Sequence, residues 1–383
     1  MADLGDPCKR RRISADDPLA SLRTPCYVVD LKVARANAER MLAIAKAKGT
    51  VLRPHVKTHK TIEGGILQTG GTKRRIVVSS LAEAEFFANG GFEDILYAVP
   101  ITPDKLPQAA ALTAQMESFH ILIDHEVQLN AILECPVPRK GQQWSIVMMV
   151  DCGYHRDGVD PADDASIALA KRIHNAPNTK FVGIYTHGGH SYDASSMDEL
   201  IKIGEQERDA VTGFAAKLRE AGVACDMVGV GSTPTSSKPP SHLDGVTEMH
   251  PGNYVYYDWM QVKLGACRPE DVAVRVCARI IGQYPKQNML LIDMGWTGIS
   301  AQGKEEGYGF IEGHPELKIH HLKQECGEVE SADGSPLDFS EYPIGSILRI
   351  LPWHSCAASH QHESVYTLED GKVVGNWKKT RGW

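Results

Sequence analysis

A lysine lies between two histidines in the stretch RPHVKTHKT, residues 53–61, directly after a short apolar pair. An amine at the end of a strand has the chemistry of a covalent anchor or a general base, and imidazoles beside it would help set its environment. Lysine and histidine are equally ordinary where a strand tip emerges into solvent. Lys57, with His55 and His59 on either side, therefore leaves both interpretations open until the surrounding elements are considered.

Composition excludes several classes of protein. The 383 residues leave room for two domains, and 42% hydrophobic with 23% charged residues is typical of a soluble globular protein. A net charge of −7 argues against nucleic acid as the main partner. No apolar run approaches the roughly 18 residues that span a bilayer, so no membrane association is expected.

The N-terminus carries no apolar signal-peptide core, which favours the cytoplasm. The nine cysteines are accordingly expected to be reduced thiols, and no CxxC pair offers a four-cysteine zinc site. A basic run at residues 9–12 is compatible with a nuclear address or with a solvated, flexible tail, which we expect over residues 1–22.

Short apolar runs alternate with helical stretches from about residue 50 to 260. Such alternation predicts a parallel sheet covered on both faces. About eight repeats favour a closed (β/α)8 barrel over an open doubly wound sheet, which stays the alternative. The runs are 51–52, 75–80, 94–100, 119–124, 145–151, 180–187, 226–232 and a weaker one near 246–257.

The pattern changes after about residue 268. Segments such as VAVRVCARIIGQYP and SVYTLEDGKVVGNWKK resemble antiparallel strands with turn signals, which indicates a second, mostly antiparallel β domain. The expected organisation is a lead-in over 23–40 that joins the β domain to the barrel, a barrel over 41–267 and the β domain over 268–383.

Polar groups gather where the predicted barrel strands end. Active sites of such barrels lie at the carboxyl ends of the strands, and these ends provide Lys57, Asp151, Tyr185 and His187. Two Gly/Ser/Thr-containing turns, 230–237 and 250–258, follow the last two strands, where barrels commonly bind phosphate on backbone N–H groups. Each turn alone is compatible with a plain loop. Together with a lysine after the first strand, they suggest pyridoxal phosphate attached to that lysine.

Eight segments resemble, in order, the eukaryotic D-serine dehydratase family of alanine-racemase-like pyridoxal phosphate enzymes. The resemblance runs from about residue 23 to 360, and its most specific parts are the lysine motif and the final His-x-Cys. The segments are TPCYVVDLKVARANAERM, RPHVKTHKT, VDCGYHRDGV, YTHGGHSY, GSTPT, PGNYVYYD, IDMGWTGIS and LPWHSC.

The resemblance implies roles for residues of this chain. Lys57 would be the cofactor lysine, and Arg156 would lie near the cofactor's phenolic oxygen, although a surface ion pair with Asp157 or Asp160 is the alternative. A metal role for the pair His187 and His190 is also open. The tyrosines that would line the pocket are Tyr185 and Tyr192, and the residues of the phosphate turns are Thr233, Thr235, Gly252 and Asn253.

The His-x-Cys motif suggests a metal site. If His354 and Cys356 lie on a strand, positions i and i+2 share a face, and imidazole with thiolate favours zinc. The alternatives are a buried cysteine beside a surface histidine, or the rival pair His360 and His362. Many relatives carry asparagine and histidine where this chain has Trp353 and Cys326, which bears on the shape of the pocket.

The activity implied by the resemblance is zinc-assisted β-elimination of water from D-serine, with Lys57 as the general base. A D-threonine-type aldolase or another lyase of 3-hydroxy D-amino acids shares the fold. The resemblance implies a His-x-Asp metal pair for the aldolase family, whereas this chain has His-x-Cys at 354–356, which favours the dehydratase. A racemase would need a second base and no zinc, and a non-catalytic cofactor carrier would lack the β domain. The resemblance also implies a homodimer.

Overall fold

The computed structural model describes residues 18–136, 139 and 141–383 and divides the chain into two compact units. Unit 2, the barrel unit, contains Ala38–Tyr254 and Thr380–Trp383. Unit 1, the β unit, contains the chain up to Asn37 and Val255–Lys379. The boundary therefore precedes the one expected at 267/268, because the segment after Tyr254 packs on the β unit: Met260 N–H donates to the Trp353 carbonyl (3.1 Å).

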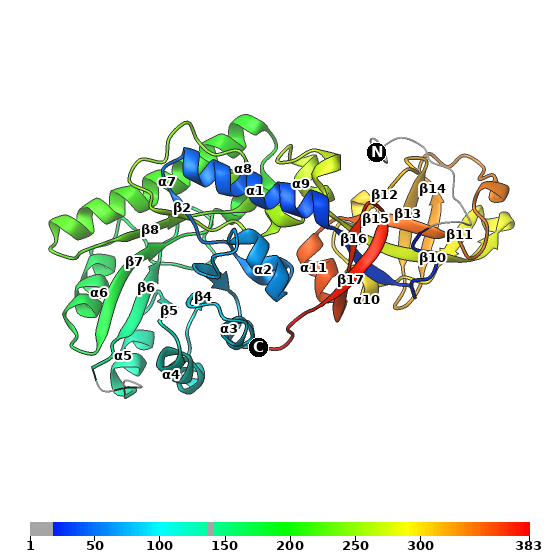
Figure 1. Ribbon diagram of the computed structural model, residues 1–383. Helices are drawn as coiled ribbons and strands as arrows, with labels where there is room; N and C mark the ends of the chain where they lie inside the picture. The colour runs from blue at the N-terminus through cyan, green and yellow to red at the C-terminus, as the bar shows by residue number, and fades with distance from the viewer. Residues whose placement is uncertain (1–17, 137–138, 140) are drawn as a thin grey trace. The chain divides into compact units, whose positions relative to one another are not determined.

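The barrel unit contains the predicted run of parallel strands (Figure 1), so the expectation of a (β/α)8 barrel is confirmed. In the described chain eight strands form one sheet in the order β2-β9-β8-β7-β6-β5-β4-β3. The strands are β2 (Val51–Leu52), β3 (Ile76–Val78), β4 (Asp94–Pro100), β5 (Ser118–Ile123), β6 (Trp144–Met149), β7 (Thr179–Tyr185), β8 (Met227–Val230) and β9 (Glu248–Met249).

Helices between these strands lie outside the curved sheet (Figure 1). Several begin with a serine cap: Ser80 accepts a hydrogen bond from Glu83 N–H, and Ser196 accepts one from Glu199 N–H. The helices are α1 (Leu31–Ala47), α2 (Ile62–Gln68), α3 (Leu81–Asn89), α4 (Leu106–Gln115), α5 (Glu126–Glu134), α6 (Asp164–Asn175), α7 (Met197–Glu220) and the short α8 (Thr233–Ser237).

The β unit is built on a nine-stranded, mostly antiparallel sheet, as predicted. Strand β1 pairs antiparallel with β10 and parallel with β16. Three short helices complete the unit: α9 (Trp259–Lys263), α10 (Trp296–Ile299) and α11 (Ser355–His360). The strands are β1 (Cys26–Asp30), β10 (Val274–Tyr284), β11 (Met289–Ile292), β12 (Gly309–Ile311), β13 (Leu317–Leu322), β14 (Gly327–Ser331), β15 (Ile347–Pro352), β16 (Ser364–Glu369) and β17 (Lys372–Lys378).

The last residues of the expected N-terminal tail are packed. Leu19 and Leu22 are buried in a core cluster with Cys26, Val28 and Cys277 of the β unit. The tail therefore does not extend to residue 22, because these two leucines gain burial by covering one face of the sheet. The basic run at 9–12 lies outside the described residues.

No helix in the described ranges is long and apolar enough to cross a membrane.

The barrel closes where the two-residue strand β2 meets β3. Here the described chain shows one isolated parallel bridge, His55 to Val77, and a hydrogen bond from Val77 N–H to the Pro54 carbonyl (2.9 Å). On its other side β2 pairs regularly with β9. This closure matters for the site because Lys57 follows β2 directly.

The barrel interior is layered. One apolar cluster joins the inward-facing residues of neighbouring strands, and residues two positions earlier share that face because side chains alternate along a strand. Asp94 thus precedes Leu96, and His120 precedes Leu122. The apolar layer consists of Val77, Leu96, Leu122, Val147, Met149, Tyr185 and Met227.

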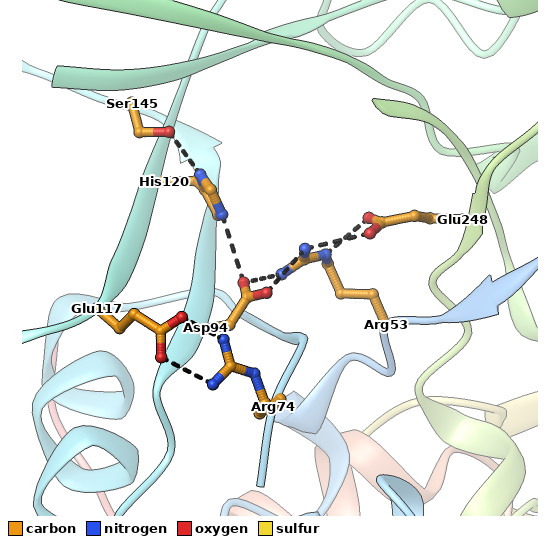
Figure 2. Close-up of polar contacts among 7 residues, drawn as sticks. All are labelled: Arg53, Arg74, Asp94, Glu117, His120, Ser145 and Glu248. Atoms are coloured by element: carbon orange, nitrogen blue, oxygen red, sulfur yellow. Dashed lines mark hydrogen bonds and ion pairs between the residues drawn. The ribbon is translucent and has the colours of Figure 1, made fainter. Parts of the chain in front are cut away.

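The layer nearer the strand starts is charged and contains Arg53 at its centre (Figure 2). The Arg53 guanidinium donates to Glu248 Oε2 (2.7 Å) and is paired with Asp94 Oδ1 (2.5 Å). His120 lies between Asp94 (3.3 Å) and Ser145 (2.6 Å). Glu248 belongs to β9 and Asp94 to β4, so Arg53 connects strands on both sides of the closure.

Burial alone would raise the pKa of Asp94. The hydrogen bond from His120 and the charge and hydrogen bonds of Arg53 outweigh burial and hold that pKa well below its usual range. The carboxylate is therefore ionised at neutral pH and matched by a guanidinium that is always protonated.

We predict that Arg53→Met lowers the free energy of unfolding by about 3–5 kcal/mol, because it leaves buried carboxylates without their counter-charge. Arg74→Met is the matched control, since Arg74 pairs on the surface with Glu117 (Figure 2) and with Glu93, and its loss should change stability little. Urea unfolding of both variants measures the difference. Equal losses would show that the buried network does not hold the closure together.

Candidate active site

Lys57 lies in a 3-10 helix, η1 (Val56–Thr58), at the carboxyl end of the barrel. His55 caps this helix, because its Nδ1 accepts a hydrogen bond from Lys57 N–H (3.3 Å). The His55 N–H in turn donates to the Pro251 carbonyl (3.0 Å), at the turn after β9. The main chain on which Lys57 sits is thus attached to the last strand of the barrel.

Three histidines with depressed pKa values follow the ends of barrel strands; His55 and His250 are buried and His187 is half-buried. Desolvation lowers the pKa of all three, and the positive charge of Lys57 lowers those of His55 and His187 further. The pKa of His187 is about 3. Its Nδ1–H donates to the Gly231 carbonyl (2.9 Å), which makes Nε2 the accepting nitrogen. The imidazoles of His55 and His187, whose pKa values respond to Lys57, are therefore neutral at physiological pH.

His59 has a different role from His55. Its Nδ1 accepts from Thr61 N–H (3.0 Å), and its Nε2 contacts Gln68 Oε1 (2.8 Å), while Gln68 Nε2 donates to the Gly252 carbonyl (3.1 Å). His59 therefore positions the lysine loop against the turn at Gly252 through Gln68.

Gly252 is in close contact with the chain that leads to Lys57. A Cβ at Gly252 would lie 2.8 Å from the His55 carbonyl oxygen. A side chain at this position would therefore displace the lysine loop, besides any effect on an anion at the turn.

The loop after β8 offers two hydroxyls that could bind an anion. Thr233 Oγ1 and Ser236 Oγ are buried, and neither has a hydrogen-bond partner among the described residues. Buried polar atoms without partners are rare and indicate a missing ligand or water. The Thr235 hydroxyl is already engaged, since it donates to Glu207 Oε2 (3.0 Å). This arrangement suits the phosphate of pyridoxal phosphate, and Ser236 joins the residues predicted from the sequence.

The remaining predicted pocket residues lie around the same strand ends. Tyr185 is buried in the barrel and stacks on His250, with ring centroids 3.9 Å apart. The Tyr192 ring lies 6.4 Å from that of His187. Arg156 forms the ion pair with Asp157 (3.1 Å) that was its alternative from the sequence. Arg156 is nevertheless close enough to Tyr185 for its charge to oppose the rise in pKa that burial gives the phenol.

The His-x-Cys motif lies in the β unit, at a strand-to-helix junction. Strand β15 ends at Pro352; His354 is the N-cap of α11 and Cys356 lies in its first turn. The expectation that both residues lie on a strand is therefore wrong, and the strand argument for a shared face does not apply. The chain turns here because Ser355 N–H donates to Asp258 Oδ2 (2.8 Å).

The donor set at this junction fits zinc. His354 Nδ1 contacts Gln302 Oε1 (2.8 Å), which places the ring proton on Nδ1, so any metal here would be coordinated through Nε2. Tyr27 O–H donates to the Ser355 carbonyl (3.3 Å), so both backbone groups between the two side chains are held. In the described chain no group of three or more His, Cys, Asp or Glu could hold a metal. A metal here would thus need water or substrate to complete its coordination.

The rival pair is arranged differently. His362 Nε2 contacts the Gly298 carbonyl (2.7 Å), and the ring lies 5.5 Å from that of Tyr27. His360 is exposed at the end of α11. His187 and His190 also differ in their surroundings: His187 bonds to Gly231, and His190 stacks on Tyr154 with ring centroids 6.1 Å apart.

Sequence reasoning missed the residues that act through others, Gln68, Glu207 and Asp258. Glu207 had a recognisable signal, since it falls on the buried face of α7 between Ile203 and Val211, where an acidic side chain is unusual. The roles of Gln68 and Asp258 had no such signal, because the Gly252 carbonyl and the Ser355 N–H that they bind are distant in sequence.

Two family models match the chain. Residues 29–258 match "Alanine racemase, N-terminal domain", and residues 273–368 match "Putative serine dehydratase domain". The fold and the lysine at the end of the first barrel strand thus define an alanine-racemase-like enzyme, a class that implies pyridoxal phosphate.

Full-length relatives narrow this class. The D-serine dehydratase of Dictyostelium discoideum is 35% identical over 96% of this chain and 99% of that protein. The D-threo-3-hydroxyaspartate dehydratase of Delftia sp. (strain HT23) is 35% identical over 96% of this chain and 100% of that protein, and its solved structure has a TM-score of 0.91. A D-threonine aldolase from Arthrobacter sp is 28% identical over 94% of this chain and 93% of that protein. The chain belongs to the D-serine dehydratase family and is a lyase.

A D-threo-3-hydroxyaspartate dehydratase that is 34% identical to this chain has also been solved as two alanine variants. One replaces a histidine and the other a cysteine two positions further along, and the cysteine variant is in the metal-free form.

We predict that His55, His187 and His250 make the protein less stable as the pH falls. Their folded pKa values are depressed, so below about pH 6.5 the unfolded state binds protons that the folded state does not. Below that pH, each imidazole should lower the free energy of unfolding by up to about 1.4 kcal/mol per pH unit. For His187 this loss should continue until the pH nears its folded pKa of about 3.

Urea unfolding at pH 7.5, 6 and 5 measures this slope. His187→Asn should make it shallower, whereas His174→Asn, at an exposed position on α6, should leave it unchanged. A slope that is the same in all three proteins would contradict neutral burial of His187.

Proposed function

We propose that the protein is a pyridoxal phosphate- and zinc-dependent D-serine dehydratase that converts D-serine into pyruvate and ammonia. The observation that carries the proposal is the position of Lys57 among neutral imidazoles, at the barrel end where two buried hydroxyls lack partners. An amine and an anion site at one barrel mouth match the two ends of pyridoxal phosphate.

Lys57 Nζ would hold the cofactor and, once released by the substrate amine, take the proton from the substrate's α-carbon. Neutral histidines suit this role, because cationic ones would make the amine a weaker base or repel its protonated form. When bound, pyridoxal phosphate supplies the electron sink that stabilises negative charge at the α-carbon.

The other cofactor contacts come from the loops. Thr233 and Ser236 would donate to the phosphate, with Gly252 and Asn253 at the neighbouring turn. Tyr185 and Tyr192 would line the pocket, and Arg156 would turn from Asp157 toward the ring. Thr235 remains part of the proposed phosphate-binding loop, although its hydroxyl already donates to Glu207.

His354 and Cys356 would hold zinc, which supplies a Lewis acid for the departing β-hydroxyl. Hydroxide needs this help, because the pKa of its conjugate acid is about 15.7 in bulk water. The metal-free cysteine variant of D-threo-3-hydroxyaspartate dehydratase supports the assignment, since His-x-Cys has the same spacing here.

A second candidate substrate is D-threo-3-hydroxyaspartate. The relatives named for the two substrates are both 35% identical to this chain, so identity does not separate them. Both are 3-hydroxy D-amino acids that lose hydroxide from the β-carbon. Pyruvate from D-serine and oxaloacetate from hydroxyaspartate, measured in parallel, distinguish them.

A homodimer and a location in the cytoplasm are also part of the proposal. Sedimentation and tagging of the full-length chain test them.

We predict that Lys57→Ala abolishes pyruvate formation from D-serine, because the chain then lacks both anchor and base. Borohydride reduction followed by peptide mapping should fix the cofactor to Lys57 in the native protein and to no peptide in the variant. Lys60→Ala is the matched control, since Lys60 pairs with Glu83 (2.8 Å) and should not replace Lys57. Full activity in the Lys57 variant would refute the proposed mechanism.

We predict that Cys356→Ala loses zinc and most D-serine turnover but keeps bound cofactor. β-Chloro-D-alanine, whose leaving group needs no Lewis acid, should still be processed. Metal analysis, cofactor absorbance and both assays check this, with Cys135→Ala on the barrel unit as the control. Equal loss of both activities would make the metal structural, and loss of neither would leave His354 and Cys356 without a metal role.

A further inference from the structure

The loops after β7 and β8 are held together by a buried carboxylate from outside the barrel. Glu207 lies on α7, where its side chain is almost completely buried. Its Oε1 accepts from the N–H groups of Gly188 (2.7 Å) and Gly231 (2.9 Å), and its Oε2 accepts from the Thr235 hydroxyl (3.0 Å). A single side chain thus binds one residue of the β7 loop and two of the β8 loop.

The contact is tight at the first of these loops. A Cβ at Gly188 would lie 3.0 Å from the Glu207 carboxylate, closer than nine in ten such contacts. A side chain at residue 188 would therefore require the Glu207 carboxylate to shift by a few tenths of an ångström.

The Glu207 carboxylate also fixes the direction of a chain of hydroxyls. Because Thr235 gives its one proton to Glu207, the Ser232 hydroxyl must donate to Thr235 (2.9 Å), and the Ser191 hydroxyl must donate to Ser232 (2.7 Å). The backbone groups agree: Thr235 N–H donates to Ser232 Oγ (3.2 Å), and Ser232 N–H donates to Thr235 Oγ1 (3.2 Å).

Ser232 and Thr235 each then accept two hydrogen bonds and donate one, so neither hydroxyl has capacity left for a ligand. The hydroxyls with that capacity are those of Thr233 and Ser236, which flank them in α8 and lack partners among the described residues. The network thus separates the hydroxyls that support the loop from those that would contact an anion.

We propose that Glu207 is a positioning residue for the cofactor's phosphate: it sets the hydroxyl chain that holds Thr233 and Ser236 in place. This inference rests on the proposed function, in which these two hydroxyls bind the phosphate of pyridoxal phosphate. Glu207 itself would touch neither cofactor nor substrate.

An amide cannot replace the carboxylate without changing this network. In Glu207→Gln the new NH2 group faces either the Thr235 hydroxyl or two backbone N–H groups. The first orientation reverses every hydroxyl of the chain and leaves the Ser191 proton without its acceptor, and the second sets donor against donor, while shape and volume are kept. The substitution therefore tests hydrogen-bond direction rather than packing.

The experiment compares pyridoxal phosphate with pyridoxal, which lacks the phosphate, in cofactor-free protein. Dissociation constants are measured by absorbance and fluorescence for the native protein, Glu207→Gln, Ser191→Ala and Glu220→Gln, with thermal unfolding as the check of folding. Glu220 is an exposed glutamate at the end of the same helix and is the matched control.

In Glu207→Gln the dissociation constant for pyridoxal phosphate should rise by about tenfold or more, the equivalent of one charge-assisted hydrogen bond. The constant for pyridoxal should change by less than about twofold, because Lys57 and the pocket are unaltered. Ser191→Ala, which removes only the far end of the chain, should show the same selectivity with a smaller rise. If Glu207→Gln does not fold, the Ser191→Ala variant tests the inference on its own.

Equal weakening of both ligands would show that Glu207 acts on the whole pocket, and an unchanged constant for pyridoxal phosphate would show that it does not act on the phosphate. Either result overturns the inference and leaves the proposed function standing. A native protein that binds neither ligand would instead remove the proposed function and this inference with it.

Discussion

Arg53 is buried between Glu248 and Asp94, on strands that flank the closure of the barrel (Figure 2). A barrel whose first strand is two residues long has few ladder hydrogen bonds there, and His55 to Val77 is an isolated bridge. The guanidinium compensates by bonding carboxylates on both sides in a poorly solvated interior, where leaving either one unpaired is costly. Lys57 follows four residues later, so the closure fixes where the amine can be.

Helix side chains position the loops at the other end of the strands. Gln68, at the end of α2, joins His59 to the Gly252 carbonyl, and Glu207 on α7 joins Gly188 to Gly231. Loops at a barrel mouth carry the functional groups but have few ladder bonds of their own. A buried polar side chain that accepts or donates several backbone hydrogen bonds gives such loops one arrangement, because any other leaves buried groups unsatisfied.

In the β unit, side chains hydrogen-bonded to the backbone likewise fix the chain around Ser355. Its N–H is bound by Asp258 and its carbonyl by Tyr27, so the residue between His354 and Cys356 is held on both sides. The contact from Gln302 sets the tautomer of His354. In the proposed zinc site, two protein ligands would leave coordination positions open for water or a substrate hydroxyl.

Apolar periodicity was sufficient to predict the barrel, the second β domain and most strand bounds, because burial is a local property of each strand. Lys57 could be recognised because it follows a strand end, where barrel chemistry is located.

Three features required long-range contacts. The barrel unit ends at Tyr254 because the next segment packs on the β unit, and Leu19 and Leu22 are core residues because a distant sheet covers them. His354 lies at a helix start because Asp258, far away in the chain, binds the N–H of Ser355. The local pattern also cannot distinguish Thr233 from Thr235. The Thr235 hydroxyl donates to Glu207, whereas the Thr233 hydroxyl has no partner among the described residues. Hydrogen-bond partners that are distant in sequence leave no trace in the spacing of residues.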